Sequence, residues 1–544
     1  MTTRKKCWMA GIAAFLILVT VGAFVAASII AKRFEPMIRD QAIRYLRERF
    51  NSEVEIAALR INPPKMSTFQ ILLRHGRGAM VGVEGEGVSM RFGGNRDLPP
   101  LFKIQKLFFI VDLGVLVEKR KTVEFVSLDG VEINIPPKGD RPDLDGSNGG
   151  KSSSEKLNVI IKDAQLHNAL LVIHPKEQSK QPLRFAIEHL RLTSVGVNSA
   201  MKYQAAMTIP MPPGTLHSDG SFGPWQATEP GDTPLDGHYT FDKANLGVFD
   251  AIAGMLNSTG QFDGTLDSVR ARGEASVPNF RLKAVDNPVP LYTRFAVLVD
   301  GTNGNTVLQP VRAKLGSTNF TTTGGIIKHE DQGHRAISLR VSMPHGDMRD
   351  LLRLAMKGSP FMEGVIDLRS RIDIPPLTGS VKEKLLLDGE FDISDAKFLR
   401  STIQDQIDQL SRRGQGQPKY EEIDEVVSNM KGAFRLENQL MTFRSLSFEV
   451  PGANVELAGD YDLAKDVIDF YGALKLDAKV SQTMTGWKRW VLRPADPFFS
   501  KHGAGTYLRI KVEGTSRQPK FGLGGKHDAR TDPKNAQNTG PDFK

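Results

Sequence analysis

The stretch VELAGDYDLAKDVIDFYGALKLDAKV, residues 455–480, decides the fold class of this 544-residue chain. Apolar and polar side chains alternate along it in two runs, which Lys465 and Asp466 separate. Successive side chains of a β-strand point to opposite faces, so this alternation predicts a hairpin in a sheet that is apolar on one side and wet on the other. The candidate apolar groove face comprises Val455, Leu457, Tyr461, Leu463, Ile468, Phe470, Leu474 and Leu476.

Strand-like sequence of the same kind recurs along the chain, for example where Ile337, Leu339 and Val341 alternate with polar residues. A loose signature accompanies it, in which a glycine is followed two residues later by an aromatic residue. Two such positions share one face of a strand, so the glycine permits bending or close approach and the ring covers apolar surface beside it. We predict a mainly β fold, a long, curved, repetitive sheet with a few short helices. The signature occurs at Gly220/Phe222, Gly237/Tyr239, Gly260/Phe262, Gly389/Phe391, Gly432/Phe434 and Gly459/Tyr461.

Short helices and polar segments interrupt the predicted strands. Residues 138–156 contain almost no apolar side chain and are predicted to form a flexible linker or a long loop, and the tail at 524–544 is predicted to be disordered. Residues 157–523 are then one repetitive β region. Helices are predicted at 246–256, 347–356, 402–410, 420–430 and 486–491.

An N-terminal apolar segment, residues 7–31, carries no charged residue. About 20 apolar residues suffice to cross a bilayer as a helix, so we predict a transmembrane anchor. Val25-Ala26-Ala27 leaves a cleaved signal peptide as an alternative. Basic residues are more numerous after the segment than before it, so charge alone does not fix the orientation.

A membrane-proximal helix is predicted directly after the anchor, within a first region at 32–137. One stripe of this helix is apolar and consists of Phe34, Ile38, Tyr45, Leu46 and Phe50. Basic residues lie off that stripe and favour anionic headgroups, although a helix that merely caps the first strands has the same pattern.

Composition restricts the classes of function. The only cysteine is Cys7, so the rest of the chain has neither a disulfide nor thiolate chemistry. The formal net charge is +9, but no Lys/Arg block is interleaved with aromatic residues, so we predict no nucleic-acid partner.

Motifs for catalysis or cofactor binding are missing. Residues 146–152 resemble a phosphate-binding loop, but Asp145 replaces the required first glycine, so we predict no nucleotide binding. His329 and His334 are five residues apart rather than four, which favours a hairpin tip over a zinc site. We predict no enzyme, cofactor or metal, although a carboxylate pair assembled by folding leaves an envelope hydrolase open.

Several segments resemble the bacterial AsmA-like family, which is related to TamB, YhdP and the bridge-like lipid transfer proteins. The resemblance covers nearly the whole chain apart from 138–156 and the tail, and it includes no catalytic motif. The segments that carry it include Leu246-Gly247-Val248-Phe249, Phe262-Asp263-Gly264-Thr265-Leu266, Val299-Asp300-Gly301-Thr302-Asn303-Gly304, Pro451-Gly452-Ala453 and Pro494-Ala495-Asp496-Pro497-Phe498-Phe499.

The resemblance implies an inner-membrane protein with a single crossing, residues 1–6 on the cytoplasmic side and the bulk of the chain in the periplasm, where a curled β-sheet forms an apolar groove. The expected function is lipid handling for phospholipid transport and outer-membrane biogenesis. The expected partners are the acyl chains of membrane phospholipids and envelope-assembly proteins. A scaffolding protein that assists outer-membrane protein assembly, with a filled β-core, is the alternative.

Overall fold

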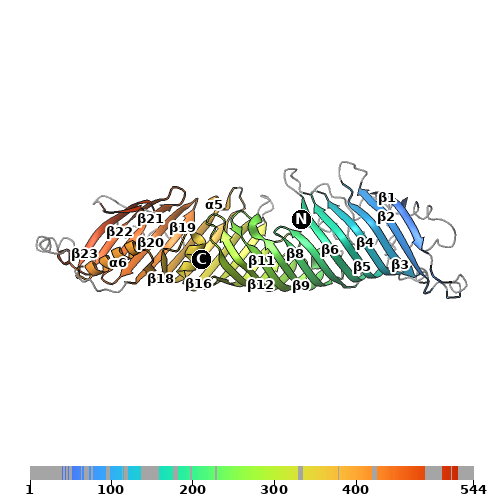
Figure 1. The fold of residues 1–544 in the computed structure, drawn as a ribbon, viewed down its shortest axis with the longest axis horizontal. Helices are drawn as coiled ribbons and strands as arrows, with labels where there is room; N and C mark the ends of the chain where they lie inside the picture. The colour runs from blue at the N-terminus through green and yellow to red at the C-terminus, as the bar shows by residue number, and fades with distance from the viewer. Residues whose placement is uncertain are drawn as a thin grey trace. The chain divides into compact units, whose positions relative to one another are not determined.

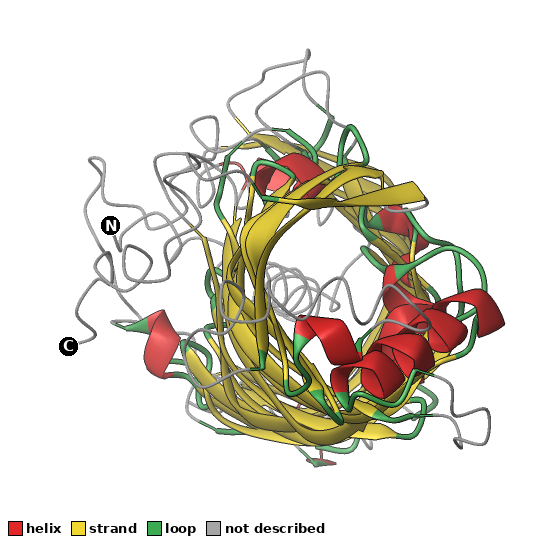
Figure 2. Cartoon of the chain, turned by 90° about the vertical axis from the view of Figure 1, so that its left-hand side faces the viewer, coloured by secondary structure: helices red, strands yellow, loops and turns green. Residues whose placement is uncertain are grey.

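The computed structural model describes most residues between Ser52 and Gly524 and, before them, Asp40, Ile43, Arg44 and Arg47. Strands predominate and helices are few (Figures 1 and 2). The description omits residues 63, 67–72, 75–76, 93–98, 113, 115–120, 137–158, 175–181, 197–198, 227–228, 329–334, 378, 419–425, 484–504 and 516–517.

The described strands belong to a 24-stranded sheet, and the chain separates into two compact units. The N-terminal unit consists of Met1–Val248, Leu256–Glu274 and Leu298–Asn303. The C-terminal unit consists of Phe249–Met255, Ala275–Val297 and Gly304–Lys544. The predicted mainly β fold is therefore confirmed.

The N-terminal unit is a meander in which each strand pairs with the next, antiparallel except for the parallel pair β4–β5. A parallel pair requires a long crossover connection. The predicted loop at 138–156 falls within that connection and outside the described residues. The strands are β1 (Ser52–Asn62), β2 (Met80–Phe92), β3 (Phe102–Asp112), β4 (Lys121–Ile135), β5 (Val159–Ile173), β6 (Leu183–Gly196), β7 (Met201–Pro210), β8 (Pro213–Phe222), β9 (Pro234–Asn245) and β11 (Met255–Thr265).

The core of the N-terminal unit lies on one face of β1–β6. Val81, Val83, Val126 and Leu128 are fully buried there. The register places Val83 opposite Phe109, and Phe109 opposite Val126, so the apolar residues of three strands form one row. The alternating pattern of these strands thus produces a filled core.

The C-terminal unit is an antiparallel meander from β14 to β24. Its strands follow a curve, seen where this unit faces the viewer (Figure 2). Both β12 (Ser268–Leu282) and β13 (Val289–Val299) contribute residues to both units. The other strands are β14 (Thr306–Leu315), β15 (Thr318–Lys328), β16 (Arg335–Asp347), β17 (Met362–Ile374), β18 (Leu386–Phe398), β19 (Ser428–Glu437), β20 (Leu440–Val450), β21 (Ala453–Asp462), β22 (Val467–Leu476), β23 (Thr506–Thr515) and β24 (Gln518–Leu523).

Two of the predicted helices are confirmed. The helix predicted at 347–356 is α4 (Met348–Ala355), and the one predicted at 402–410 lies within α6 (Ser401–Gly414). The other helical segments with defined bounds are short: α5 (Val381–Lys384), η2 (Pro230–Asp232), η3 (Leu246–Val248) and η4 (Val480–Gln482).

Two other helix predictions are wrong where the structure describes them. Residues 246–256 form only the turn η3 before the chain extends into β10 (Ile252–Ala253) and β11. Gly254 there has a φ of +141°, which a helix does not contain, and β10 pairs with β12. In 420–430, Ser428 to Met430 are already part of β19. Short apolar runs do not distinguish a strand from a helix by periodicity alone.

The predicted anchor at 7–31, the helix at 486–491 and the tail lie outside the described residues, as do Phe34, Ile38, Tyr45, Leu46 and Phe50 of the membrane-proximal stripe. Of the helices that the structure describes, none combines the length and the apolar character that a bilayer crossing needs.

Rings lie over glycines of the neighbouring strand, which explains the glycine–aromatic signature. Gly389 faces Phe434 and Phe391 faces Gly432 across the β18–β19 pair. A Cβ atom at Gly432 would lie 2.7 Å from Cε1 of Phe391, so a larger residue would displace the ring. The two rings are 6.2 Å apart between centroids. The signature thus allows bulky rings to pack across adjacent strands.

We expect the substitution Gly432→Ala to destabilise the C-terminal unit by about 1–3 kcal/mol, because the added methyl group forces Phe391 out of its position. The measurement is the urea midpoint of unfolding of the full chain. Gly522→Ala is the matched control, since a Cβ at Gly522 meets no atom within 4 Å. Equal midpoints for the two variants would contradict this packing role.

Candidate functional site: an apolar sheet face

Rows of apolar residues and glycines cross the C-terminal unit from strand to strand. One row runs through all strands from β14 to β24, and the spacing of about 4.8 Å between strands makes it roughly 48 Å long. We call the face that carries this row and the parallel rows beside it the apolar face. The members of the row, in strand order, are Leu308, Gly324, Leu339, Ile372, Leu387, Leu436, Met441, Tyr461, Ile468, Gly514 and Pro519.

The predicted face residues of β21 and β22 lie opposite one another in the observed register. Val455 faces Leu474, and Tyr461 faces Ile468. Leu457 faces Gly472, which leaves room beside the leucine side chain. The register therefore places these residues of 455–480 on one face.

Phe470 and Leu463 have different surroundings. Phe470 is only 9% exposed and faces Gly459, and its ring centroid lies 5.6 Å from that of Phe443 on β20. Phe443 faces Gly459 from the other side, so the two rings approach each other over the glycine. Leu463 falls one residue beyond the end of β21 and is 38% exposed.

The helices α4 and α6 cover only one margin of the apolar face. Ile407 of α6 packs into a buried cluster with Val450, Ala453 and Leu476, and Leu474 packs against this cluster. At α4, a second cluster joins Leu352 to buried residues of β16, β17 and β18. Leu474 and Leu476 of the predicted face thus belong to a local core beneath a helix.

Away from that margin the apolar face is half-buried. In the row from Leu308 to Pro519 every member is half-buried except Leu436, which is buried, and Pro519, which is exposed. At the β24 edge, Phe521 and Leu523 are 73% and 76% exposed. Among the described residues, no helix or second sheet packs over the middle of this face.

The opposite face of the same strands is charged. Lys431 pairs with Asp392, and Lys475 pairs with Glu456. These four side chains are between 32% and 63% exposed, so each pair adds little to stability. They make this face of the sheet hydrophilic, and the apolar face is its reverse side.

Polar side chains hold α6 against the ends of the strands. Gln404 is 4% exposed; its amide oxygen accepts a hydrogen bond from the Phe398 amide, and its Nε2 donates to the Val426 carbonyl oxygen. Ser411 Oγ donates to the Pro451 carbonyl oxygen. These bonds to main-chain groups fix the position of the helix along the margin.

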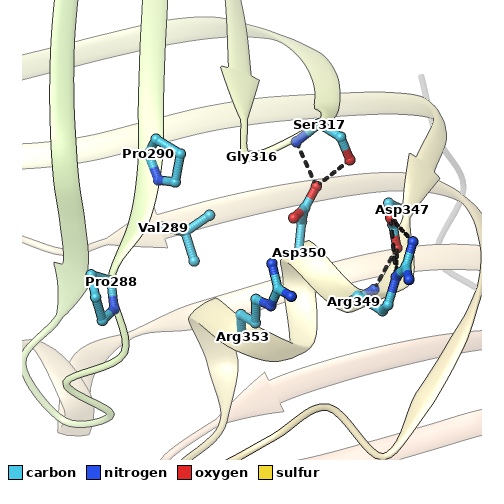
Figure 3. Close-up of a pocket in the computed structure, with 9 residues that line it drawn as sticks. All are labelled: Pro288, Val289, Pro290, Gly316, Ser317, Asp347, Arg349, Asp350 and Arg353. Atoms are coloured by element: carbon cyan, nitrogen blue, oxygen red, sulfur yellow. Dashed lines mark hydrogen bonds and ion pairs between the residues drawn. The ribbon is translucent and has the colours of Figure 1, made fainter. Parts of the chain in front are cut away.

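A pocket of about 360 Å³ lies where α4 meets the β14–β15 turn (Figure 3). Asp350 of α4 is 4% exposed, and its Oδ2 accepts hydrogen bonds from Ser317 N at 2.8 Å, Ser317 Oγ at 2.7 Å and Thr318 Oγ1 at 3.0 Å. A Cβ at Gly316 would lie 2.3 Å from Asp350 Oδ1, so the turn needs a glycine there. The pocket is therefore built around a carboxylate that joins the helix to the sheet.

Asp347 caps the N-terminus of α4. Its Oδ1 accepts a hydrogen bond from the Arg349 main-chain N at 2.9 Å, and its Oδ2 accepts one from Arg349 Nη2 at 2.9 Å. The hydrogen bond from the Arg349 side chain lowers the pKa of Asp347 below its ordinary value, against a smaller opposing effect of burial.

Clusters of metal-ligating side chains are absent from the part of the chain that the structure describes. Among the described residues, no group of three or more His, Cys, Asp and Glu side chains could hold a metal ion. Residues 329–334 lie outside the described part, but the strands that they join, β15 and β16, pair directly at Lys328 and Arg335.

Comparisons with known proteins provide no identity. No protein-family model, curated protein or solved structure matches the chain. The resemblance to the AsmA-like family stays a prediction.

We expect Asp350→Asn to weaken the attachment of α4 by about 1–3 kcal/mol, because a neutral amide oxygen is a weaker acceptor than the carboxylate Oδ2 that accepts all three hydrogen bonds. Hydrogen exchange should show faster exchange of the α4 amides. Asp405→Asn, a change at an exposed position of α6, serves as the control. Unchanged exchange in α4 would show that Asp350 does not hold the helix.

The lowered pKa of Asp347 predicts an acid-sensitive contribution to stability. A carboxyl group with a lower pKa in the folded state stabilises the protein above its unfolded pKa of about 3.9, and this contribution is lost as the pH falls through the folded value. We expect Asp347→Asn to be less stable than the parent chain at neutral pH, with the difference shrinking below about pH 4. Thermal unfolding as a function of pH measures it, and a difference independent of pH would refute the assignment.

Proposed function

We propose that the apolar face of the C-terminal unit binds the acyl chains of membrane lipids. The observation that carries the proposal is the half-buried row from Leu308 to Pro519, which continues across eleven strands without a charged residue. Each methylene group that leaves water for such a surface contributes about 0.8 kcal/mol, so no catalytic residue is needed. In this proposal the protein handles lipid for phospholipid transport and outer-membrane biogenesis.

The contrast between β1–β6 and the C-terminal unit supports this function over a scaffold with a filled core. Both units have the same alternating strands. In the N-terminal unit, Val81, Val83 and Leu128 are fully buried, whereas Leu457, Tyr461 and Ile468 in the C-terminal unit remain half-buried. A sheet face that is apolar must bury itself against something. An acyl chain is a suitable occupant because it needs no directed polar contacts.

Membrane attachment belongs to the same proposal. We place the predicted anchor at 7–31 in the inner membrane and the strands in the periplasm, as the resemblance to the AsmA-like family implies. The anchor then holds the chain next to its source of lipid. Envelope-assembly proteins are the proposed partners.

We expect the purified full chain to crosslink to a phospholipid with a diazirine in its acyl chain. Mass spectrometry should locate the adducts on the uncovered rows, for example at Met441, Tyr461 and Ile468. Leu457→Glu should reduce labelling of these rows several-fold, because a carboxylate in an acyl-chain site is costly to desolvate.

Arg509→Glu is the matched control, since it introduces the same side chain opposite Ala473 on the charged face. Circular dichroism should show that both variants fold. Absence of adducts on the apolar face, or equal labelling in both variants, would refute the lipid function and favour the scaffold.

A further inference from the structure

Two histidines form a close pair on the N-terminal unit, far in sequence from the proposed lipid site. His167 of β5 lies directly opposite His189 of β6. Their Nδ1 atoms are 3.3 Å apart, and their ring centroids are 4.9 Å apart with 39° between the planes. Both side chains are half-buried, so solvent reaches the pair.

The pair lies on the face of the sheet away from the core. On β5, Ala164 and Leu166 are buried in the core. Asp163 lies four residues before His167, hence on the same face as His167, and forms an ion pair with Arg191. Two adjacent, paired strands thus hold the two rings. The ion pair between Asp163 and Arg191 lies on the same face.

The separation of the two nitrogens matches that of two ligands of one metal ion. Zinc binds imidazole nitrogen at about 2.0–2.1 Å, and at that distance two nitrogens 3.3 Å apart subtend roughly 107° at the metal. This angle is close to the tetrahedral value. In the structure the two Nδ1 atoms share a hydrogen bond, so a bound ion takes the place of the shared proton. The ring torsion about Cβ–Cγ is soft, so each ring can turn to direct its Nδ1 lone pair at the ion.

The geometry points to a two-histidine site for a borderline-soft divalent cation, Zn²⁺, Ni²⁺ or Cu²⁺. Imidazole suits these ions, whereas Mg²⁺ and Ca²⁺ require oxygen ligands. The described residues offer no third His, Cys, Asp or Glu ligand within reach, so water fills the other positions. Asp129 faces His167 from β4, but its Oδ1 accepts a hydrogen bond from Asn168 at 2.8 Å. A bound ion joins β5 to β6.

The test is calorimetric titration of the chelator-treated full chain with ZnCl₂ and with NiCl₂ in a non-coordinating buffer. We expect His167→Gln and His189→Gln each to remove one binding event or weaken it more than tenfold. Glutamine retains a polar amide at the position but is a poor ligand for these ions. His217→Gln, at an exposed position of β8, is the control and should leave the titration unchanged.

Electron paramagnetic resonance of the Cu²⁺ complex gives a second readout. We expect coupling to two imidazole nitrogens in the parent chain and the loss of one in either variant. Titrations and spectra that are the same in the parent chain and in both variants would overturn the proposal. Lipid crosslinking does not depend on this pair, so the two proposals can fail separately.

Discussion

The C-terminal unit depends on one constraint, which is that every strand must place its apolar residues on the same side in register with its neighbours. A shift by one residue would move a whole strand's apolar set to the charged face. Glycines opposite rings help to maintain the register, because Phe391 fits over Gly432 and Phe434 fits over Gly389, and a side chain at either glycine would meet the ring. The glycine–aromatic signature therefore helps to determine which residues pair across adjacent strands.

Helices cover the apolar face only along one margin. Two of them, α4 and α6, lie at one margin and are attached by buried polar groups, Asp350 in one case and Gln404 in the other. A helix attached only by apolar contacts could slide along an apolar sheet, since such contacts have little directionality. Hydrogen bonds to main-chain groups at the strand ends prevent this. The attachment leaves the central rows without a helix over them.

Sequence reasoning found the strands, the common face in 455–480 and two of the helices, because period-two alternation is a local signal. It did not find that Leu476 packs beneath α6, since the α6 residue Ile407 is distant in sequence. Burial of Asp350 and the pairing of His167 with His189 were also missed. Both require the register of strands or turns that are far apart in the chain, which single-sequence patterns do not encode.

The filled and the uncovered face also differ in the side chains that form them. The N-terminal core is rich in valine and alanine, such as Val81, Val83 and Ala164, which pack closely on a sheet. In the C-terminal unit, phenylalanine, leucine and tyrosine alternate with glycine, as in Phe443, Gly459 and Phe470. Phe443 and Phe470, which are tilted by 51° to each other over Gly459, form a continuous apolar surface across three strands. Such a surface is suited to a long, featureless occupant, and an acyl chain has that shape.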